Sequence, residues 1–129
     1  DHLYGGAGND TMTGGTDTDT FIWNYSDRGI AGSPDVDHIT DFDKSTDVID
    51  IRELLDTKGE SATDLLKHLS VADTTTGITI SIHNGTVNTV STDVTNQIVL
   101  DGVHSTSGVS ASDLLTTLIN SQHLLIDKT

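Results

Sequence analysis

The chain has 129 residues with 20 acidic and 6 basic side chains, a formal net charge of −14, no cysteine and 4% aromatic residues. This length suits one domain with a modest core. The charge opposes binding to nucleic acid or to an anionic membrane surface, the lack of cysteine excludes a disulfide framework, and no apolar run approaches the roughly 20 residues of a membrane span.

The first twenty-two residues contain two contiguous copies of the nine-residue pattern G-G-x-G-x-D-x-U-x, where U is a large apolar residue. The copies occupy residues 5–13 and 14–22. Asp1 and Leu3 fall at the Asp and apolar positions of a preceding copy, so we expect the chain to open inside a repeat array, as an excised fragment would. The alternative, ordinary turns in a threonine-rich β protein, suits a lone G-G-x-G better than contiguous copies in register.

Each part of the pattern suggests a physical role. Glycine tolerates positive φ, so the loop carbonyls can turn toward one point, while the Asp adds a carboxylate and the apolar residue begins a short strand facing inward. Ca²⁺ takes six to eight oxygen ligands in flexible geometry and suits such a loop better than Mg²⁺. Asp17 stands where the fourth glycine of the second copy belongs, and Asp tolerates left-handed backbone better than most residues. The candidate ligands are Asp1, Gly5, Gly6, Gly8, Asp10, Gly14, Gly15, Asp17 and Asp19.

These repeats resemble those of the RTX family, the calcium-binding, type I secreted proteins of Gram-negative bacteria. The resemblance implies a parallel β-roll whose ions lie between turns two repeats apart, with Asp1 and Asp19 on one side and Asp10 on the other. The implied fold is mainly β: the end of a calcium-binding parallel β-roll, capped by a small β-sheet with two short helices.

Acidic residues are concentrated beside the repeats. Residues 1–60 hold fourteen acidic and four basic side chains, and residues 61–129 hold six and two. Without metal, this repulsion opposes compaction, so we expect Ca²⁺ to contribute to folding itself.

A turn-rich segment over residues 24–34 follows the repeats, and we expect the roll to stop there. Residues 35–51 then predict two short strands around a turn at residues 43–47. Their D-x-I-x-D-F-D and D-V-I-D-I runs resemble the segment after the last repeats of RTX adhesins and serralysin-type proteases, which caps the roll. Asp37 and Asp41 are our candidate ligands there; the alternative is an edge strand carrying solvated charges. We therefore divide one cooperative unit into repeats, residues 1–30, and a cap, residues 31–129.

Two later segments, residues 61–69 and 110–118, share a Ser N-cap, an Asp three residues on and leucines at helical spacing, which predicts two short amphipathic helices. Between them, residues 77–82 alternate, Asn84-Gly85 favours a type I′ turn and residues 86–90 alternate back, as in a β-hairpin. Residues 97–100 predict a further strand, and Ile78, Ile80 and Ile82 could pack on the same side as Val87 or Ile98 in a small sheet beside the roll.

The apolar tail, residues 114–129, corresponds by resemblance to the uncleaved C-terminal signal read by the type I exporter; an ordinary helix packed on the core suits it equally. The motifs, and the order in which these segments follow one another, resemble the C-terminal secretion-target domain of long RTX adhesins. This implies a secreted, extracellular protein at the cell surface of a Gram-negative bacterium, and we expect the fragment to be monomeric.

Enzyme motifs are missing: there is no H-E-x-x-H, no G-x-S-x-G and no cysteine nucleophile. The six histidines lack metal-ligand spacing. We therefore expect a non-enzymatic calcium-binding domain that folds outside the cell and caps an RTX adhesin. Two alternatives stay open: the C-terminal cap of a secreted hydrolase, and a calcium-dependent adhesive tip that binds a sugar, peptide or surface.

Overall fold

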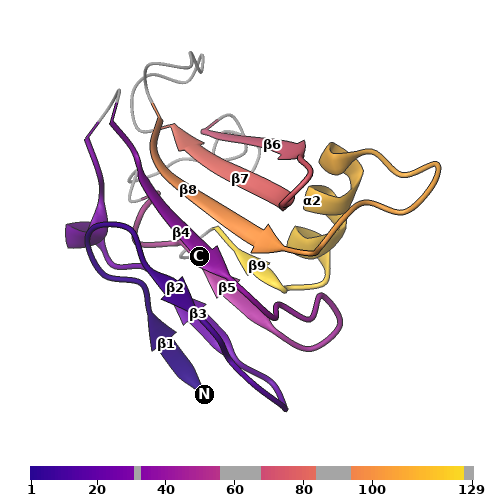
Figure 1. The fold of residues 1–129 in the computed structure, drawn as a ribbon, viewed down its shortest axis with the longest axis horizontal. Helices are drawn as coiled ribbons and strands as arrows, with labels where there is room; N and C mark the ends of the chain where they lie inside the picture. The colour runs from indigo at the N-terminus through magenta and orange to yellow at the C-terminus, as the bar shows by residue number, and fades with distance from the viewer. Residues whose placement is uncertain (31–32, 56–67, 84–93, 127–129) are drawn as a thin grey trace.

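Two stacked β-sheets and one α-helix make up the part of the chain that the structure describes, which is residues 1–30, 33–55, 68–83 and 94–126 of a computed structural model (Figure 1). The four-stranded sheet has the order β1 (His2–Tyr4), β3 (Thr20–Ile22), β5 (Val48–Asp50), β9 (Leu124–Leu125). The five-stranded sheet has the order β2 (Thr11–Met12), β4 (Asp35–Ile39), β8 (Val94–Asp101), β7 (Gly77–His83), β6 (Leu69–Asp73). The expectation of a mainly β fold is confirmed.

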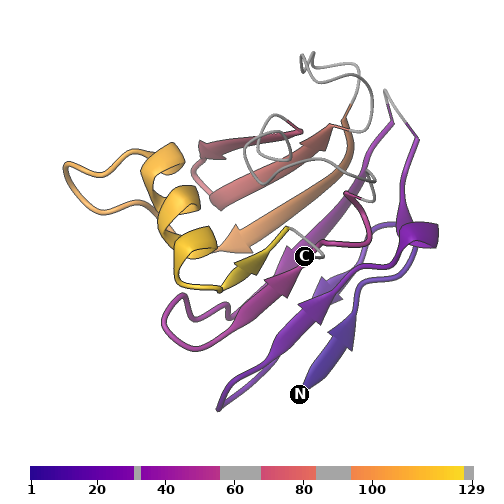
Figure 2. The same ribbon diagram turned by 180° about the vertical axis from the view of Figure 1, so that it is seen from behind.

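The strands β1 to β5 alternate between the two sheets, and their neighbours within each sheet are parallel (Figure 2). His2 pairs with Thr20, and Thr20 in turn pairs with Val48. The alternation therefore continues past residues 24–34, where we expected the repeats to stop. The strands β8 and β9 then add a further parallel neighbour to β4 and β5. Strand order does not test the division of this one cooperative unit into repeats, residues 1–30, and cap, residues 31–129, which stays a prediction.

The apolar residue of each repeat points between the sheets. Met12 and Phe21 are buried, and so are the residues paired with them in the next turn, Ile39 and Ile49. Such burial stabilises the fold by about 1.5–3 kcal/mol for each large side chain. Because strand side chains alternate in direction, the flanking threonines face outward while these residues fill the core.

The antiparallel part of the five-stranded sheet centres on β7, whose Ile78, Ile80 and Ile82 are buried, with Ile80 opposite Ile98 of β8. The strands predicted over residues 77–82 and 97–100 are confirmed. The turn at Asn84-Gly85 and the return strand over residues 86–90 lie outside the described residues. Strand β6 was not predicted: Leu69, the last residue of the predicted helix 61–69, is the first residue of β6, and residues 61–67 lie outside the described part.

The helix predicted over residues 110–118 is confirmed as α2, Ala111–Asn120. The Ser110 hydroxyl accepts a hydrogen bond from the Asp113 amide at 3.0 Å, as expected of an N-cap. Leu114, Leu115 and Leu118 are buried where α2 packs against β6 and β9, at the end of the sheets remote from β1 (Figures 1 and 2). No helix among the described residues is both long and apolar enough to cross a membrane.

Candidate metal centre

The two glycine-rich loops share one backbone conformation. The first loop joins β1 to β2 and has positive φ at Gly6 (79°) and Gly8 (92°). The second joins β2 to β3 and has positive φ at Gly15 (93°) and Asp17 (73°), the same two positions of the nine-residue pattern. Asp17 therefore takes the backbone role of the missing glycine, as Asp can at modest strain.

The first glycine of each repeat is required for space. A Cβ on Gly5 would lie 2.3 Å from Trp23 Nε1, and a Cβ on Gly14 would lie 2.4 Å from Asp19 Oδ2. The indole ring covers one loop, and a carboxylate covers the other. The first glycine of each repeat thus lies directly against a buried side chain.

The repeat aspartates are linked from turn to turn by hydrogen bonds between a main-chain nitrogen of one turn and a carboxylate oxygen of the next. The Asp1 nitrogen donates to Asp19 Oδ1 at 2.6 Å, and the Asp19 amide donates to Asp47 Oδ1 at 3.0 Å. On the other side, the Asp10 amide donates to Asp37 Oδ1 at 2.7 Å. The structure thus brings the candidate ligands Asp1 and Asp19 together and places Asp10 beside Asp37.

Asp41, the remaining candidate ligand, lies against the second glycine loop. Its two carboxylate oxygens accept hydrogen bonds from the amides of Gly14 (2.9 Å) and Gly15 (2.7 Å). Asp35 accepts similarly from the Gly8 amide at 2.9 Å. Sequence reasoning missed Asp35 and Asp47. The signal for Asp35 was present, since the D-x-D-x-U run from Asp35 repeats the G-x-D-x-U run from Gly8 twenty-seven residues later.

Asp37 is fully buried, and its second oxygen accepts the indole N–H of Trp23 at 2.7 Å. Burial raises the pKa of this carboxyl above its ordinary value, although the bonds from Trp23 and the Asp10 amide oppose the change. The neighbouring Asp10 and Asp35 carboxylates raise it further. The carboxylate is therefore held by directed N–H donors within a crowded acidic region.

Two carboxylate oxygens in the glycine loops are buried without a hydrogen-bond partner among the described residues, Asp10 Oδ2 and Asp19 Oδ2. Such atoms are costly unless something satisfies them. No three histidine or acidic side chains in the described ranges are arranged so that they could hold one metal ion, so a bound cation would take most of its ligands from loop carbonyls. One carboxylate oxygen with several carbonyls is a donor set that Ca²⁺ accepts, and the residues present therefore fit calcium.

Comparison with known proteins agrees with this geometry. The family model of the RTX calcium-binding nonapeptide repeat matches residues 1–21. The first twenty-one residues are therefore similar to the calcium-binding RTX repeat. No curated protein sequence matches the chain.

Two solved structures from Azotobacter vinelandii resemble this chain. The AlgE6R3 subunit of the mannuronan C5-epimerase is 27% identical with a TM-score of 0.50, over 78% of this chain and 55% of that one. The AlgE6R2 subunit is 22% identical with a TM-score of 0.58, over 99% of this chain and 72% of that one. The chain thus spans little more than half of the first of these structures, and the likeness to the second concerns the fold alone.

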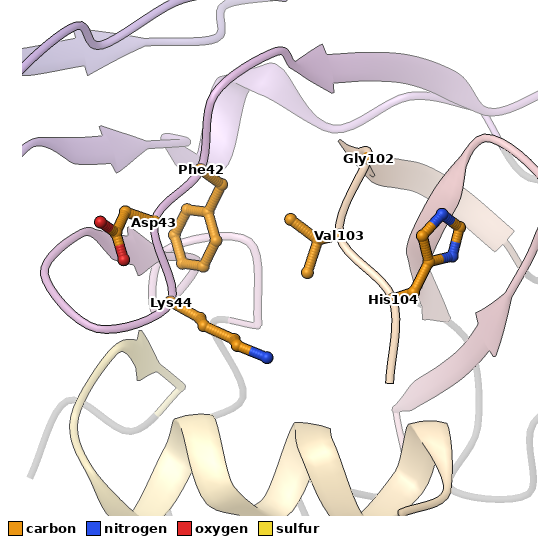
Figure 3. Close-up of a pocket in the computed structure, with 6 residues that line it drawn as sticks. All are labelled: Phe42, Asp43, Lys44, Gly102, Val103 and His104. Carbon is orange, nitrogen blue, oxygen red and sulfur yellow. The ribbon is translucent and has the colours of Figure 1, made fainter. Parts of the chain in front are cut away.

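Away from the RTX repeats, a hollow of about 500 Å³ opens between the turn after β4 and the end of β8 (Figure 3). Phe42 and Val103 face each other across it, and Lys44 reaches toward its mouth. His104 Nδ1 forms a hydrogen bond with Asp73 Oδ1 at 2.6 Å. The charged residues of this lining, Asp43, Lys44 and His104, are exposed, so the hollow presents no buried charged group to orient a ligand.

Proposed function

We propose that the chain is a non-enzymatic calcium-binding module that folds on Ca²⁺ outside the cell and carries the type I secretion signal of an RTX adhesin. The observation that carries the calcium part is a pair of buried oxygens, Asp10 Oδ2 and Asp19 Oδ2, which have no partner among the described residues and lie in loops that match RTX repeats. Loop carbonyls and these two carboxylates would hold the ions, in a parallel β-roll formed by the alternating strands. The match of residues 1–21 supports this assignment.

The mechanism follows from calcium concentration and charge. Residues 1–60 carry ten more acidic than basic side chains, and their repulsion opposes folding until cations bind. Extracellular modules bind Ca²⁺ with Kd on the order of 10⁻⁴ to 10⁻³ M, so their sites stay unloaded in a calcium-poor cytosol. The chain would therefore pass the exporter unfolded, and calcium outside would fold it and prevent its return.

The C-terminal segment is the part that we assign to the exporter. The helix α2 and strand β9 pack at the end of the sheets remote from β1, where they complete the fold. In this proposal the tail, residues 114–129, is read while the chain is unfolded, and its described part, residues 114–126, packs against the core after export. The same residues thus serve both as a signal and as a cap.

A second candidate is the RTX module of a secreted carbohydrate-modifying enzyme. The likeness to the AlgE6R3 subunit of a mannuronan C5-epimerase favours it over an adhesin. The two candidates share calcium-dependent folding and differ in what precedes the repeats. A catalytic domain encoded upstream in the same reading frame would support the second, and a long run of adhesin repeats would support the first.

Secretion of a fused passenger through a type I exporter tests the export part. Replacing both Asp10 and Asp19 by Asn removes two negative charges at the repeats, whereas replacing Asp73 and Asp113 by Asn removes two elsewhere. We expect the first pair to reduce secreted, folded passenger in millimolar Ca²⁺ and the second pair to have little effect. Unchanged secretion by the first pair, with loss of calcium-dependent folding, would sink the proposed coupling of folding to export.

A further inference from the structure

A third turn of the coil repeats the RTX pattern without its glycines. Strand β4 pairs with β2 at a spacing of 27 residues, and β5 pairs with β3 at a spacing of 28. This alignment places Asp37 opposite Asp10 and Asp47 opposite Asp19, the sixth position of each repeat. We call residues 35–50 the closing turn. The RTX family match ends at residue 21 and does not include it.

The closing turn differs from the glycine loops in the partner of one oxygen. Within the described part of the chain, Oδ2 of Asp10 and of Asp19 is buried and has no hydrogen-bond partner. The equivalent oxygen of Asp37 accepts the Trp23 indole N–H at 2.7 Å, and that of Asp47 accepts the Asp43 amide at 2.9 Å. Protein N–H donors therefore stand where the glycine loops leave an oxygen available.

Trp23 occupies a distinctive place in the repeat. It lies eighteen residues after Gly5, where a third contiguous copy would have its first glycine. Its indole is fully buried and lies directly on Gly5, with the N–H aimed at Asp37. Tryptophan at position 23 thus stands where the pattern would have a glycine, and it supplies the hydrogen-bond donor to Asp37.

We infer that the closing turn binds no calcium, and that Trp23 and the Asp43 amide replace the ion there. This inference rests on the proposed calcium binding by the repeats. The ions are held by Asp10 and Asp19, whereas Asp37 and Asp47 serve as acceptors that fasten the closing turn to the loops. The closing turn is then a fixed end for the roll, and calcium loading concerns only the turns that precede it.

The inference is tested by counting bound ions in matched variants at equivalent repeat positions. Native mass spectrometry and calorimetric titration with CaCl₂ would compare Asp10→Asn with Asp37→Asn, and Asp19→Asn with Asp47→Asn. We expect Asp10→Asn and Asp19→Asn each to lose an ion or to weaken its binding by about tenfold or more, since a charged ligand is lost. We expect Asp37→Asn and Asp47→Asn to keep the wild-type ion number, with Kd within about threefold.

Each outcome bears on one proposal. Loss of an ion in Asp37→Asn or Asp47→Asn, with a folded protein, overturns the inference and leaves calcium binding intact. Absence of calcium binding by the wild-type chain overturns the proposed function instead. If Asp37→Asn does not fold, Trp23→Phe tests instead whether the closing turn binds calcium, because it removes the N–H donor and keeps every carboxylate. We expect it to lower the unfolding temperature at the wild-type ion number; a lower ion number contradicts the inference.

Discussion

The glycine loops and the closing turn differ in what compensates the second oxygen of their aspartates. In the closing turn, Asp37 and Asp47 each accept at Oδ1 an amide N–H from the preceding turn, and in the second glycine loop Asp19 Oδ1 accepts the N-terminal nitrogen of Asp1. In the glycine loops the second oxygen has no partner among the described residues, and in the closing turn it has a protein donor. A buried carboxylate needs compensation, so under the proposed function the glycine loops would take a cation from solution, whereas the closing turn provides its own donors.

The basic residues follow the same division. Residues 1–22 contain no lysine or arginine. At the end of the closing turn, Arg52 bonds both oxygens of Asp50, and Arg28 donates to the Leu54 carbonyl at 2.8 Å. Burial would raise the pKa of Asp50, but the hydrogen bonds and charge of Arg52 outweigh it, and the pKa is lowered. Arginine side chains thus bind within and beside the closing turn, and the glycine loops contain none.

The largest effect that we predict comes from Gly5→Ala, because Gly5 is where the two regions touch. Its Cβ would lie within 2.9 Å of three atoms of the buried Trp23 ring, which cannot move aside. We expect a loss of about 3 kcal/mol in the free energy of unfolding, measured by urea denaturation in Ca²⁺. The control is Gly8→Ala, whose Cβ meets open space but whose φ of 92° is strained, at about 1 kcal/mol. Equal losses in the two variants would contradict the packing of Trp23 on Gly5.

Asp41→Ala sharpens the comparison by removing a carboxylate that bonds two amides of the second glycine loop. We expect a loss of about 2 kcal/mol in unfolding free energy, because both N–H groups lose a charged acceptor. If Asp41 only accepts hydrogen bonds, the loss stays constant in urea unfolding between about 1 and 10 mM Ca²⁺. A loss that grows with Ca²⁺ concentration would instead make Asp41 a ligand, as the sequence predicted. Asp41→Asn, which keeps one acceptor, is expected to lose about half as much.

Ser110→Ala tests a region remote from both turns. It removes the hydroxyl that caps α2 through the Asp113 amide, and we expect a loss of about 1 kcal/mol in unfolding free energy. Ser112→Ala, in the exposed first turn of the same helix, is the control and is expected to change stability by less than about 0.5 kcal/mol. The effect should be the same at all saturating Ca²⁺ concentrations, since α2 lies far from the loops. A loss of unfolding free energy seen only at low Ca²⁺ concentration would show that the helix and the loops are coupled.

The smallest effect is expected at Asp73, whose pKa is lowered by hydrogen bonds from the His104 side chain and the Ser105 amide. A carboxyl with a lowered pKa in the folded state contributes stability above its unfolded value of 3.8 and loses it as pH falls through the folded value. Thermal unfolding of wild type and Asp73→Asn should therefore differ at pH 7 and converge well below pH 3.8. A difference that persists in acid would contradict this origin.

The elements with local signals were predicted well. The Ser110 cap and the leucine spacing gave α2, and the alternation of Ile78, Ile80 and Ile82 gave β7. The continuation of the coil was missed because it depends on pairing across 27 or 28 residues, and Asp35 stands where the pattern has glycine. The hydrogen bond from the Trp23 indole N–H to Asp37 could not be predicted either, because it joins side chains 14 residues apart through a buried contact. The calcium ligands remain predictions that the geometry supports and that binding measurements must test.

The most direct test is a Ca²⁺ titration of the chelator-stripped chain, following far-ultraviolet circular dichroism and Trp23 fluorescence, with Mg²⁺ as the control. Trp23 is fully buried against the first glycine loop, so its emission reports whether that loop has closed. We predict that both signals change together and cooperatively at sub-millimolar to millimolar Ca²⁺, on the order of 10⁻⁴ to 10⁻³ M, and not with Mg²⁺. Signals that do not respond to Ca²⁺ would show that the loops are ordinary turns and would contradict calcium-dependent folding.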